Sequence, residues 1–227
     1  KSELRVIAVP SIGNEPVPTV LAAIVAPEKQ GLAMHAAILE RMSAAVMQWR
    51  MSSAMATLDW EAATSAAIAE LVSKVQSTES MRESSCLLVN ALKDFADGEQ
   101  VALSFVKRIG IGCDLQAISE MAEFDKSSET VEQFTAAMDE CLIRDELTIW
   151  PPIDGSERHA TLCHRKLAEQ TNQGAAISLP LSAIDGAAVG VLTVIGDITT
   201  IQSERLQSLL LASAPHLDTA LALRKKA

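Results

Sequence analysis

One pattern of two apolar strands followed by an amphipathic helix occurs twice, and this repeat constrains the fold more than any other feature. Arg5-Val-Ile-Ala-Val-Pro10 aligns with Ala175-Ala-Ile-Ser-Leu-Pro180, and residues 19–25 then align with residues 189–195 without a gap. We therefore expect residues 1–55 to form the C-terminal part of a first domain. Residues 56–80 are expected to be a helical linker, and residues 81–227 a complete second domain.

Apolar periodicity and turn residues predict the individual elements. In the first part we expect strands at 4–9 and 19–25, and then a helix with Ile38, Met42 and Trp49 on one face. A second helix is expected to begin near Asp59, and it either continues past Thr78 or breaks there. The later elements are a helix opened by the capping box Ser80-Met-Arg-Glu83, strands at 101–107 and 110–119, a helix at 129–144, a strand at 147–150, a helix at 159–171, strands at 175–181 and 189–195 around Asp185-Gly186, and a helix at about 202–223.

Three stretches of the second part carry a family resemblance. They are Val101-Ala-Leu-Ser-Phe-Val106, Ile177-Ser-Leu-Pro-Leu181 and Val189-Gly-Val-Leu-Thr193. These stretches resemble the first strand and a later hairpin of GAF domains, and the resemblance covers nearly all of residues 81–227. It implies an α/β (α+β) fold, with a GAF-like antiparallel sheet and flanking helices, and a role in sensing a ligand.

Further stretches resemble the GAF region that precedes the adaptor part of some HlyD-type membrane-fusion proteins. They are Met47-Gln-Trp49, Ala122-Glu-Phe-Asp125, Ala136-Ala-Met-Asp-Glu140, and His159-Ala160 with Lys166-Leu-Ala168. The resemblance implies a larger protein of efflux or secretion, linked to the membrane through segments outside this chain. The chain begins at Lys1 rather than Met, so we expect it to be a piece of that protein. Arg224-Lys225-Lys226 would suit a cytoplasmic position beside a following membrane span.

Composition argues against several classes of function. The chain has 19 basic and 29 acidic residues, for a net charge of −10, and it has no Tyr and four Phe. Nucleic-acid binding is therefore not expected, because it needs clustered cations and stacking aromatics. No apolar run approaches the roughly 18 residues of a membrane span. We expect a cytoplasmic location, and reduced thiols at the widely spaced Cys86, Cys113, Cys141 and Cys163.

Six residues are candidates for ligand binding, each with a plainer alternative. Asp114 opens an acidic stretch that ends at residue 146 and is either a face that binds cations or repels partners, or solvated surface. Trp150, before two prolines, is either a pocket wall or core. Ser178 lies inside an apolar strand and lacks the Gly-x-Ser-x-Gly elbow of a nucleophile. The complete set is Asp114, Phe124, Trp150, His159, Cys163 and Ser178, and an open pocket beside Trp150 and the helix at 158–166 would support ligand binding.

Two candidates are tied to motifs that are incomplete here. His159 and Cys163 are spaced for one helical face, but no further metal ligand is near in sequence, so no metal site is expected. Phe124-Asp125 is all that remains of the cyclic-nucleotide signature of some GAF domains, so the resemblance does not support cyclic-nucleotide binding. The cofactor, if any, and the ligand are unknown from the sequence.

These observations predict a non-catalytic GAF-type module for ligand sensing or regulation. The enzyme alternative is a GAF-fold reductase of free methionine sulfoxide, which would need at least two thiols at one pocket. A third alternative is a purely structural dimerisation unit. The helices at 35–51, 59–97 and 202–223 carry wide apolar stripes, so we expect a homodimer formed through them.

Overall fold

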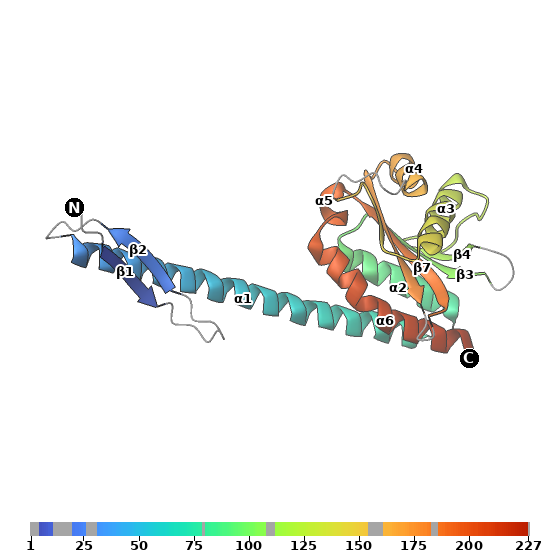
Figure 1. The fold of residues 1–227 in the computed structure, drawn as a ribbon. Coiled ribbons are helices and arrows are strands. Elements are labelled where there is room, and N and C mark those ends of the chain that lie inside the picture. Colours follow the sequence, from blue (N-terminus) through green and yellow to red (C-terminus); the bar gives the residue numbers. More distant parts are fainter. Residues whose placement is uncertain are drawn as a thin grey trace. The chain divides into compact units, whose positions relative to one another are not determined.

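The computed structural model describes residues 5–10, 20–25, 31–78, 80–107, 112–153, 161–182 and 186–226. The chain divides into two units, residues 1–63 and residues 64–227, and the division falls inside one long helix. None of the helices in these ranges combines the length and apolarity that crossing a bilayer requires. Figure 1 gives the element labels used below.

The first unit contains a strand hairpin and most of a helix. Strands β1 (Arg5–Pro10) and β2 (Val20–Val25) are antiparallel, with Arg5 opposite Val25 and Pro10 opposite Val20, which confirms the predicted strand pair. Helix α1 spans Leu32–Gln76 without interruption, so the prediction of a separate helix starting at Asp59 is wrong. The physical reason is composition: residues 32–76 contain no Gly or Pro and many Ala, so nothing favours a break. The predicted turn between the strands lies largely outside the described residues.

The second unit is built on a five-stranded antiparallel sheet in the order β4-β3-β7-β6-β5. A break separates α1 from α2, where the Ser80 hydroxyl accepts a hydrogen bond from the Glu83 N–H as the capping box predicts. The elements are α2 (Met81–Ala96), β3 (Gln100–Val106), β4 (Cys113–Ile118), α3 (Glu129–Arg144), β5 (Thr148–Trp150), α4 (Leu162–Gln170), β6 (Ala175–Ser182), β7 (Ala188–Gly196), α5 (Ile198–Ile201) and α6 (Glu204–Lys226). Only the four-residue α5 was not expected from the sequence.

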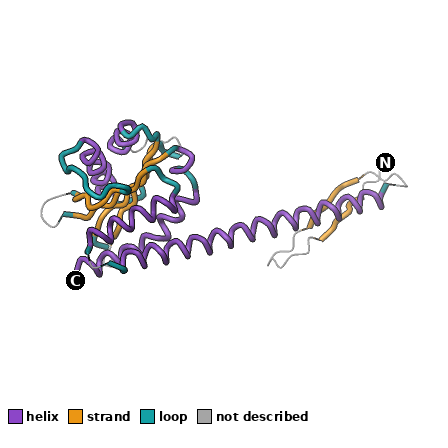
Figure 2. Tube along the Cα trace, turned by 180° about the vertical axis from the view of Figure 1, so that it is seen from behind, coloured by secondary structure: helices purple, strands orange, loops and turns teal. Residues whose placement is uncertain are grey.

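Helices cover both faces of this sheet, and Figure 2 shows the strands between them. On one face, α2, α6 and the last turns of α1 pack on large apolar side chains such as Leu103, Ile177 and Leu192. On the other face, α3 and α4 contribute Phe134, Met138 and Leu167. The sheet residues beneath α3 and α4 combine apolar side chains such as Ile118 and Val191 with small or polar ones, among them Ala102, Ser104, Ala176, Ser178 and Thr193.

Backbone contact sets the spacing between the two central strands. Gly190 of β7 lies opposite Phe105 of β3, and a Cβ atom at Gly190 would lie 2.1 Å from the Ser104 carbonyl oxygen. Real Cβ atoms do not approach backbone this closely, so only glycine fits unless the strands separate. The turn before β7 uses a second glycine, Gly186, in the left-handed region at φ 79°. Its predicted partner in the turn, Asp185, lies outside the described residues.

A chain of buried polar side chains joins α3 and α4 to the sheet. The Glu140 Oε2 atom of α3 lies 2.7 Å from Nδ1 of His164 on α4. Nε2 of His164 lies 2.8 Å from the Ser178 Oγ of β6, which lies 2.7 Å from the Thr193 Oγ1 of β7. His164, Ser178 and Thr193 are completely buried. Each polar atom in the chain has a partner, as burial requires.

The Glu140 carboxylate also anchors the start of α4. The backbone N–H of His164 donates to Oε2 at 3.2 Å, and that of Cys163 donates to Oε1 at 3.4 Å. The helix has no side-chain cap of its own, because Thr161 makes no capping hydrogen bond. Burial opposes ionisation of Glu140, but the hydrogen bonds from His164 outweigh it and lower the pKa of the carboxyl group. Glu140 therefore acts as the missing cap, from a neighbouring helix.

We predict that Ser178→Ala lowers the free energy of unfolding by about 1–3 kcal/mol, because it leaves buried polar atoms of His164 and Thr193 without a partner. Ser208→Ala is the matched control, since Ser208 is exposed on α6, and its effect should stay within about 0.5 kcal/mol. Urea unfolding measures both. Equal effects of the two substitutions would contradict the importance given to the polar chain.

Acidification gives a second readout of the same chain. Because the pKa of Glu140 is lower in the folded state, its contribution is present at neutral pH and is lost as the pH falls through that lowered value. The stability difference between the unmodified protein and Glu140→Gln should therefore shrink below about pH 4. A difference that stays constant between neutral and acid pH would show that the charge on Glu140 has no role.

Candidate functional site

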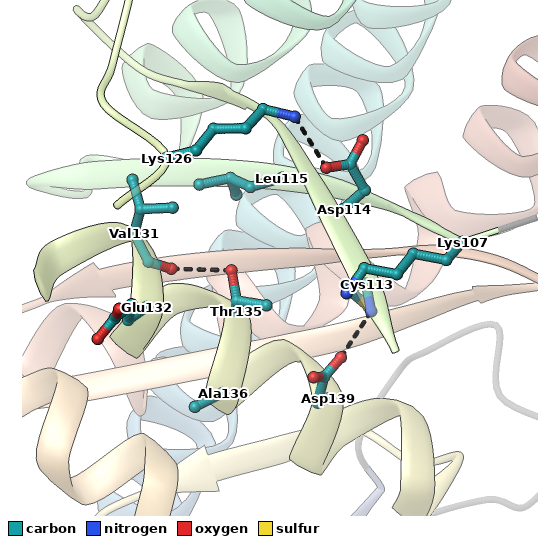
Figure 3. Close-up of a pocket in the computed structure, with 10 residues that line it drawn as sticks. All are labelled: Lys107, Cys113, Asp114, Leu115, Lys126, Val131, Glu132, Thr135, Ala136 and Asp139. Carbon is teal, nitrogen blue, oxygen red and sulfur yellow. Dashed lines mark hydrogen bonds and ion pairs between the residues drawn. The ribbon is translucent and has the colours of Figure 1, made fainter. Parts of the chain in front are cut away.

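An open pocket of about 380 Å³ lies between the edge strand β4 and helix α3. Figure 3 shows its lining side chains. They come from the end of β3, from β4, from the loop before α3, and from one face of α3; they are Lys107, Cys113, Asp114, Leu115, Lys126, Val131, Glu132, Thr135, Ala136 and Asp139. The volume falls within the range of about 300–1,000 Å³ that is usual for small-molecule sites.

Local sequence explains why the pocket walls are held in place. Helix α3 begins at the N-cap Ser128, whose hydroxyl accepts a hydrogen bond from the Val131 N–H. Farther along α3, Asp139 Oδ1 accepts a hydrogen bond of 2.7 Å from the Cys113 N–H of β4. Gly112 makes room for this carboxylate, because a Cβ there would lie 2.9 Å from both Asp139 oxygens, and its φ of 103° also favours glycine. Asp139 thus ties α3 to β4 at one end of the pocket.

Some charged side chains of the pocket already form ion pairs or hydrogen bonds with neighbouring residues, and others do not. Lys126 Nζ lies 3.0 Å from Asp114 Oδ1, and Gln116 Nε2 donates to the other Asp114 oxygen at 2.8 Å. By contrast, no hydrogen bond or ion pair within the described residues engages the Lys107 ammonium or the Glu132 carboxylate. The pocket therefore presents a free cation and a free anion to a ligand.

Burial favours the protonated form of three cysteine thiols. Burial raises the pKa of Cys113 to about 11, with a smaller contribution from the charge of Asp139, and burial raises the pKa of Cys141 to about 12. The pKa of Cys163 is also raised, by burial and by the Glu140 carboxylate. All four cysteines are free. Since the thiolate is the reactive form, these three thiols are poorly prepared for nucleophilic chemistry.

The candidates that sequence analysis singled out are not gathered at one site. Of the six, Asp114 alone lines the pocket between β4 and α3. Phe124, Trp150 and Cys163 are half-buried and pack against the core under α3 and α4. His159 lies outside the described residues. A further pocket lies between α2 and the end of β4, and neither it nor the pocket between β4 and α3 is lined by Trp150.

Two of these residues have packing roles that account for their placement. The Arg165 guanidinium lies 6.0 Å from the centre of the Trp150 ring, an arrangement typical of a cation–π contact. Ser178 belongs to the buried polar chain. The order carboxylate, imidazole, hydroxyl in that chain is that of a hydrolase triad, but Ser178 is fully buried and already bonded to Thr193, so no substrate can reach it.

The sequence analysis missed Lys107, Glu132 and Asp139. Their helical spacing at least was visible, because Glu132, Ala136 and Asp139 recur at i, i+4 and i+7 and must share one face of α3. That Lys107 faces them across the end of β4 depends on tertiary pairing. Within the described residues, no group of three or more His, Cys, Asp or Glu side chains is placed to bind a metal ion.

Comparisons with known proteins identify the fold. No family model matches the sequence, and no curated protein matches it. Among solved structures, the GAF domain of an Acinetobacter phosphoenolpyruvate-protein phosphotransferase is similar, with a TM-score of 0.54 and 16% identity over 72% of this chain and 95% of that one. The corresponding domain from Coxiella burnetii gives a TM-score of 0.53 and 12% identity over 72% of this chain and 95% of that one.

A third similar structure is an enzyme. The free methionine-R-sulfoxide reductase of Neisseria meningitidis, solved with its substrate, gives a TM-score of 0.50 and 15% identity over 70% of this chain and 88% of that one. At such identities the likeness reports the fold and not the activity. The predicted fold class is thus confirmed: this chain has the mixed helix and antiparallel-sheet fold of GAF domains.

Proposed function

We propose that this chain is a non-catalytic GAF-type module, which binds a small molecule and regulates a larger protein. The observation that carries the proposal is the open pocket between β4 and α3, where free charged groups surround the apolar side chains Leu115 and Val131. A pocket that combines an apolar surface with a few unpaired polar groups is the usual form of a small-molecule site. The GAF fold itself is compatible with sensing and with catalysis, so the function has to be inferred from the residues of the site.

Helix α3 offers a route from the pocket to the rest of the sheet. Asp139 lines the pocket, and the next residue, Glu140, begins the polar chain that reaches α4, β6 and β7. A ligand that pulls on Asp139 therefore also strains the hydrogen bonds of Glu140. Regulation by this route would shift a balance between two arrangements of α4 on the sheet.

We also propose that the parent protein is a membrane-linked adaptor of the HlyD type, with this module in the cytoplasm. The support for this context is the sequence resemblance alone. Fractionation of cells that produce the parent protein tests it. Recovery of the module only in the membrane fraction is expected, and recovery only in the soluble fraction would argue against it.

We predict that filling the pocket abolishes ligand binding. Ala136→Phe places a ring in the cavity between α3 and β4, whereas Ala212→Phe adds the same ring to an exposed position of α6. Thermal unfolding is followed with amino acids, dicarboxylates and nucleotides, each at about 10 mM. A ligand that binds only the folded state raises its stability by RT ln(1 + [L]/Kd), where [L] is the free ligand concentration. At least one class should stabilise the unmodified protein and Ala212→Phe, but not Ala136→Phe. If no class stabilises the unmodified protein, or if Ala136→Phe responds equally, the pocket is not the site.

The principal alternative is a reductase of free methionine sulfoxide. Its support is the structural similarity to the Neisseria enzyme and the position of Cys113 in the pocket. Against it stands the raised pKa of Cys113, since a thiol with a pKa near 11 is ionised in only about one molecule in ten thousand at pH 7. We therefore favour the non-catalytic assignment.

We predict that the protein does not reduce free methionine sulfoxide in the presence of a thiol reductant. Replacing Cys113, Cys141 and Cys163 together with Ser or Ala will lower stability through the loss of buried thiols. Because Cys113 lines the pocket, this variant tests catalysis and not ligand binding. Turnover by the unmodified chain that is lost in the triple variant would establish the enzyme alternative. Far-UV circular dichroism of the triple variant provides the control for folding.

A role in dimerisation is the second candidate, because α1 exposes large apolar side chains. Met34, Ile38, Met42 and Trp49 are 47–70% exposed and recur at helical spacing. A second copy of the chain could cover them in a two-fold arrangement. We predict a dimer by light scattering at about 100 μM, and a monomer for the double variant Ile38→Glu/Trp49→Glu. Gln48→Glu, exposed on another side of α1, should leave the dimer intact, and a monomeric unmodified protein would contradict the proposal.

A further inference from the structure

The free charges of the pocket are arranged in a way that selects one chemical class of ligand. Lys107 and Asp139 both act on the Cys113 thiol and so lie at the same end of the pocket, as Figure 3 also shows. Glu132 lies two helical turns before Asp139 on the same face of α3, which places it about 10 Å away along the helix axis. Leu115 of β4 and Ala136 of α3 also line the pocket, and Ala136 lies between Glu132 and Asp139 along the helix.

Charge balance excludes the simpler ligand classes. Lys126 and Asp114 neutralise each other at 3.0 Å, so among the described lining residues Lys107, Asp139 and Glu132 remain, with a net charge of −1. A dicarboxylate would form an ion pair with Lys107, but it would be repelled by the carboxylates of Asp139 and Glu132. A diamine would satisfy the two carboxylates but place an ammonium beside Lys107. Like charges held close together in a partly buried site cost binding energy, so neither class matches all three groups.

We propose that the pocket binds a basic α-amino acid with an aliphatic side chain that ends in an amine, such as L-lysine. This inference rests on the proposed ligand-sensing function and names the ligand class of the same site. The α-carboxylate pairs with Lys107, and the α-ammonium pairs with Asp139. The methylene chain lies on Leu115 and Ala136, and the terminal ammonium pairs with Glu132. The ligand's net charge of +1 then balances the lining.

The length of the ligand follows from the same geometry. An extended four-carbon side chain separates the two ammonium groups by several ångströms, and a carboxylate contact at each end adds about 3 Å. The total is about 13 Å for a fully extended side chain, so a bent side chain spans the roughly 10 Å that the helical rise gives between Glu132 and Asp139. Burial of the methylene groups adds affinity without directional bonds.

Titration calorimetry of the complete 227-residue chain with four related compounds tests the assignment. L-lysine carries all three charged groups. L-norleucine lacks the terminal amine, cadaverine lacks the carboxylate, and 6-aminohexanoate lacks the α-amine. We expect each of the three to bind at least about tenfold more weakly than L-lysine, as expected for the loss of one charge-assisted contact.

Two variants connect each group of the ligand to its partner. Glu132→Gln should remove the preference for L-lysine over L-norleucine, and Lys107→Gln should remove the preference for L-lysine over cadaverine. Lys166→Gln on α4 and Glu61→Gln on α1 are the matched controls, because both side chains are exposed and outside the pocket, and they should change neither preference.

The possible failures are distinguishable. Equal binding of L-lysine and L-norleucine, or preferences that survive in the variants, would overturn the ligand class. Binding of a dicarboxylate or a nucleotide that is lost in Ala136→Phe would also overturn the class while supporting the ligand-sensing function. Absence of binding by every compound up to about 10 mM would overturn both.

Discussion

The arrangement of the second unit depends on the burial of one carboxylate–imidazole pair. Glu140 and His164 come from different helices, and together with Ser178 and Thr193 they fill the space between those helices and the sheet. A polar chain of this kind is favourable only when every member finds its partner, because an unpaired buried group is costly. The packing of α4 is therefore specified by hydrogen bonds as well as by apolar contact. The short helix, which has no cap of its own, depends on Glu140 from its neighbour.

The buried polar chain also explains the position of the open pocket. The side chain of His164 occupies the space over Ser178 and Thr193, where small and hydroxyl-bearing sheet residues leave room. An open pocket lies at the sheet edge, between β4 and the face of α3 that carries Glu132, Ala136 and Asp139. The pocket and the polar chain meet at Asp139 and Glu140, which are adjacent in sequence but have different surroundings. A single helix thus lines an open pocket and belongs to an interior framework.

The sequence predicted the strands and helices of the second unit well, because their apolar periodicity and capping residues are local signals. The bounds of α3 agree at both ends, 129 and 144, and its N-cap Ser128 is of a favoured residue type. The site was harder to predict. Ser178 was chosen as a ligand contact, but its partner His164 lies 14 residues away and Glu140 lies 24 residues from His164. Such pairings depend on which helix packs on which strand, and one sequence carries no direct signal of that.

The close approach of β3 and β7 at Gly190 has a consequence for tracing this chain's ancestry. The requirement at Gly190 comes from a neighbouring carbonyl group, so it is independent of whatever the pocket binds. During divergence, the exposed pocket side chains Lys107 and Glu132 are free to change, whereas position 190 has no alternative residue that keeps the two strands together. At identities of 11–16%, such as those to the solved structures, alignments need positions of this kind. A glycine matched there would mark common architecture, and differences around the pocket would mark the divergence of what each relative detects.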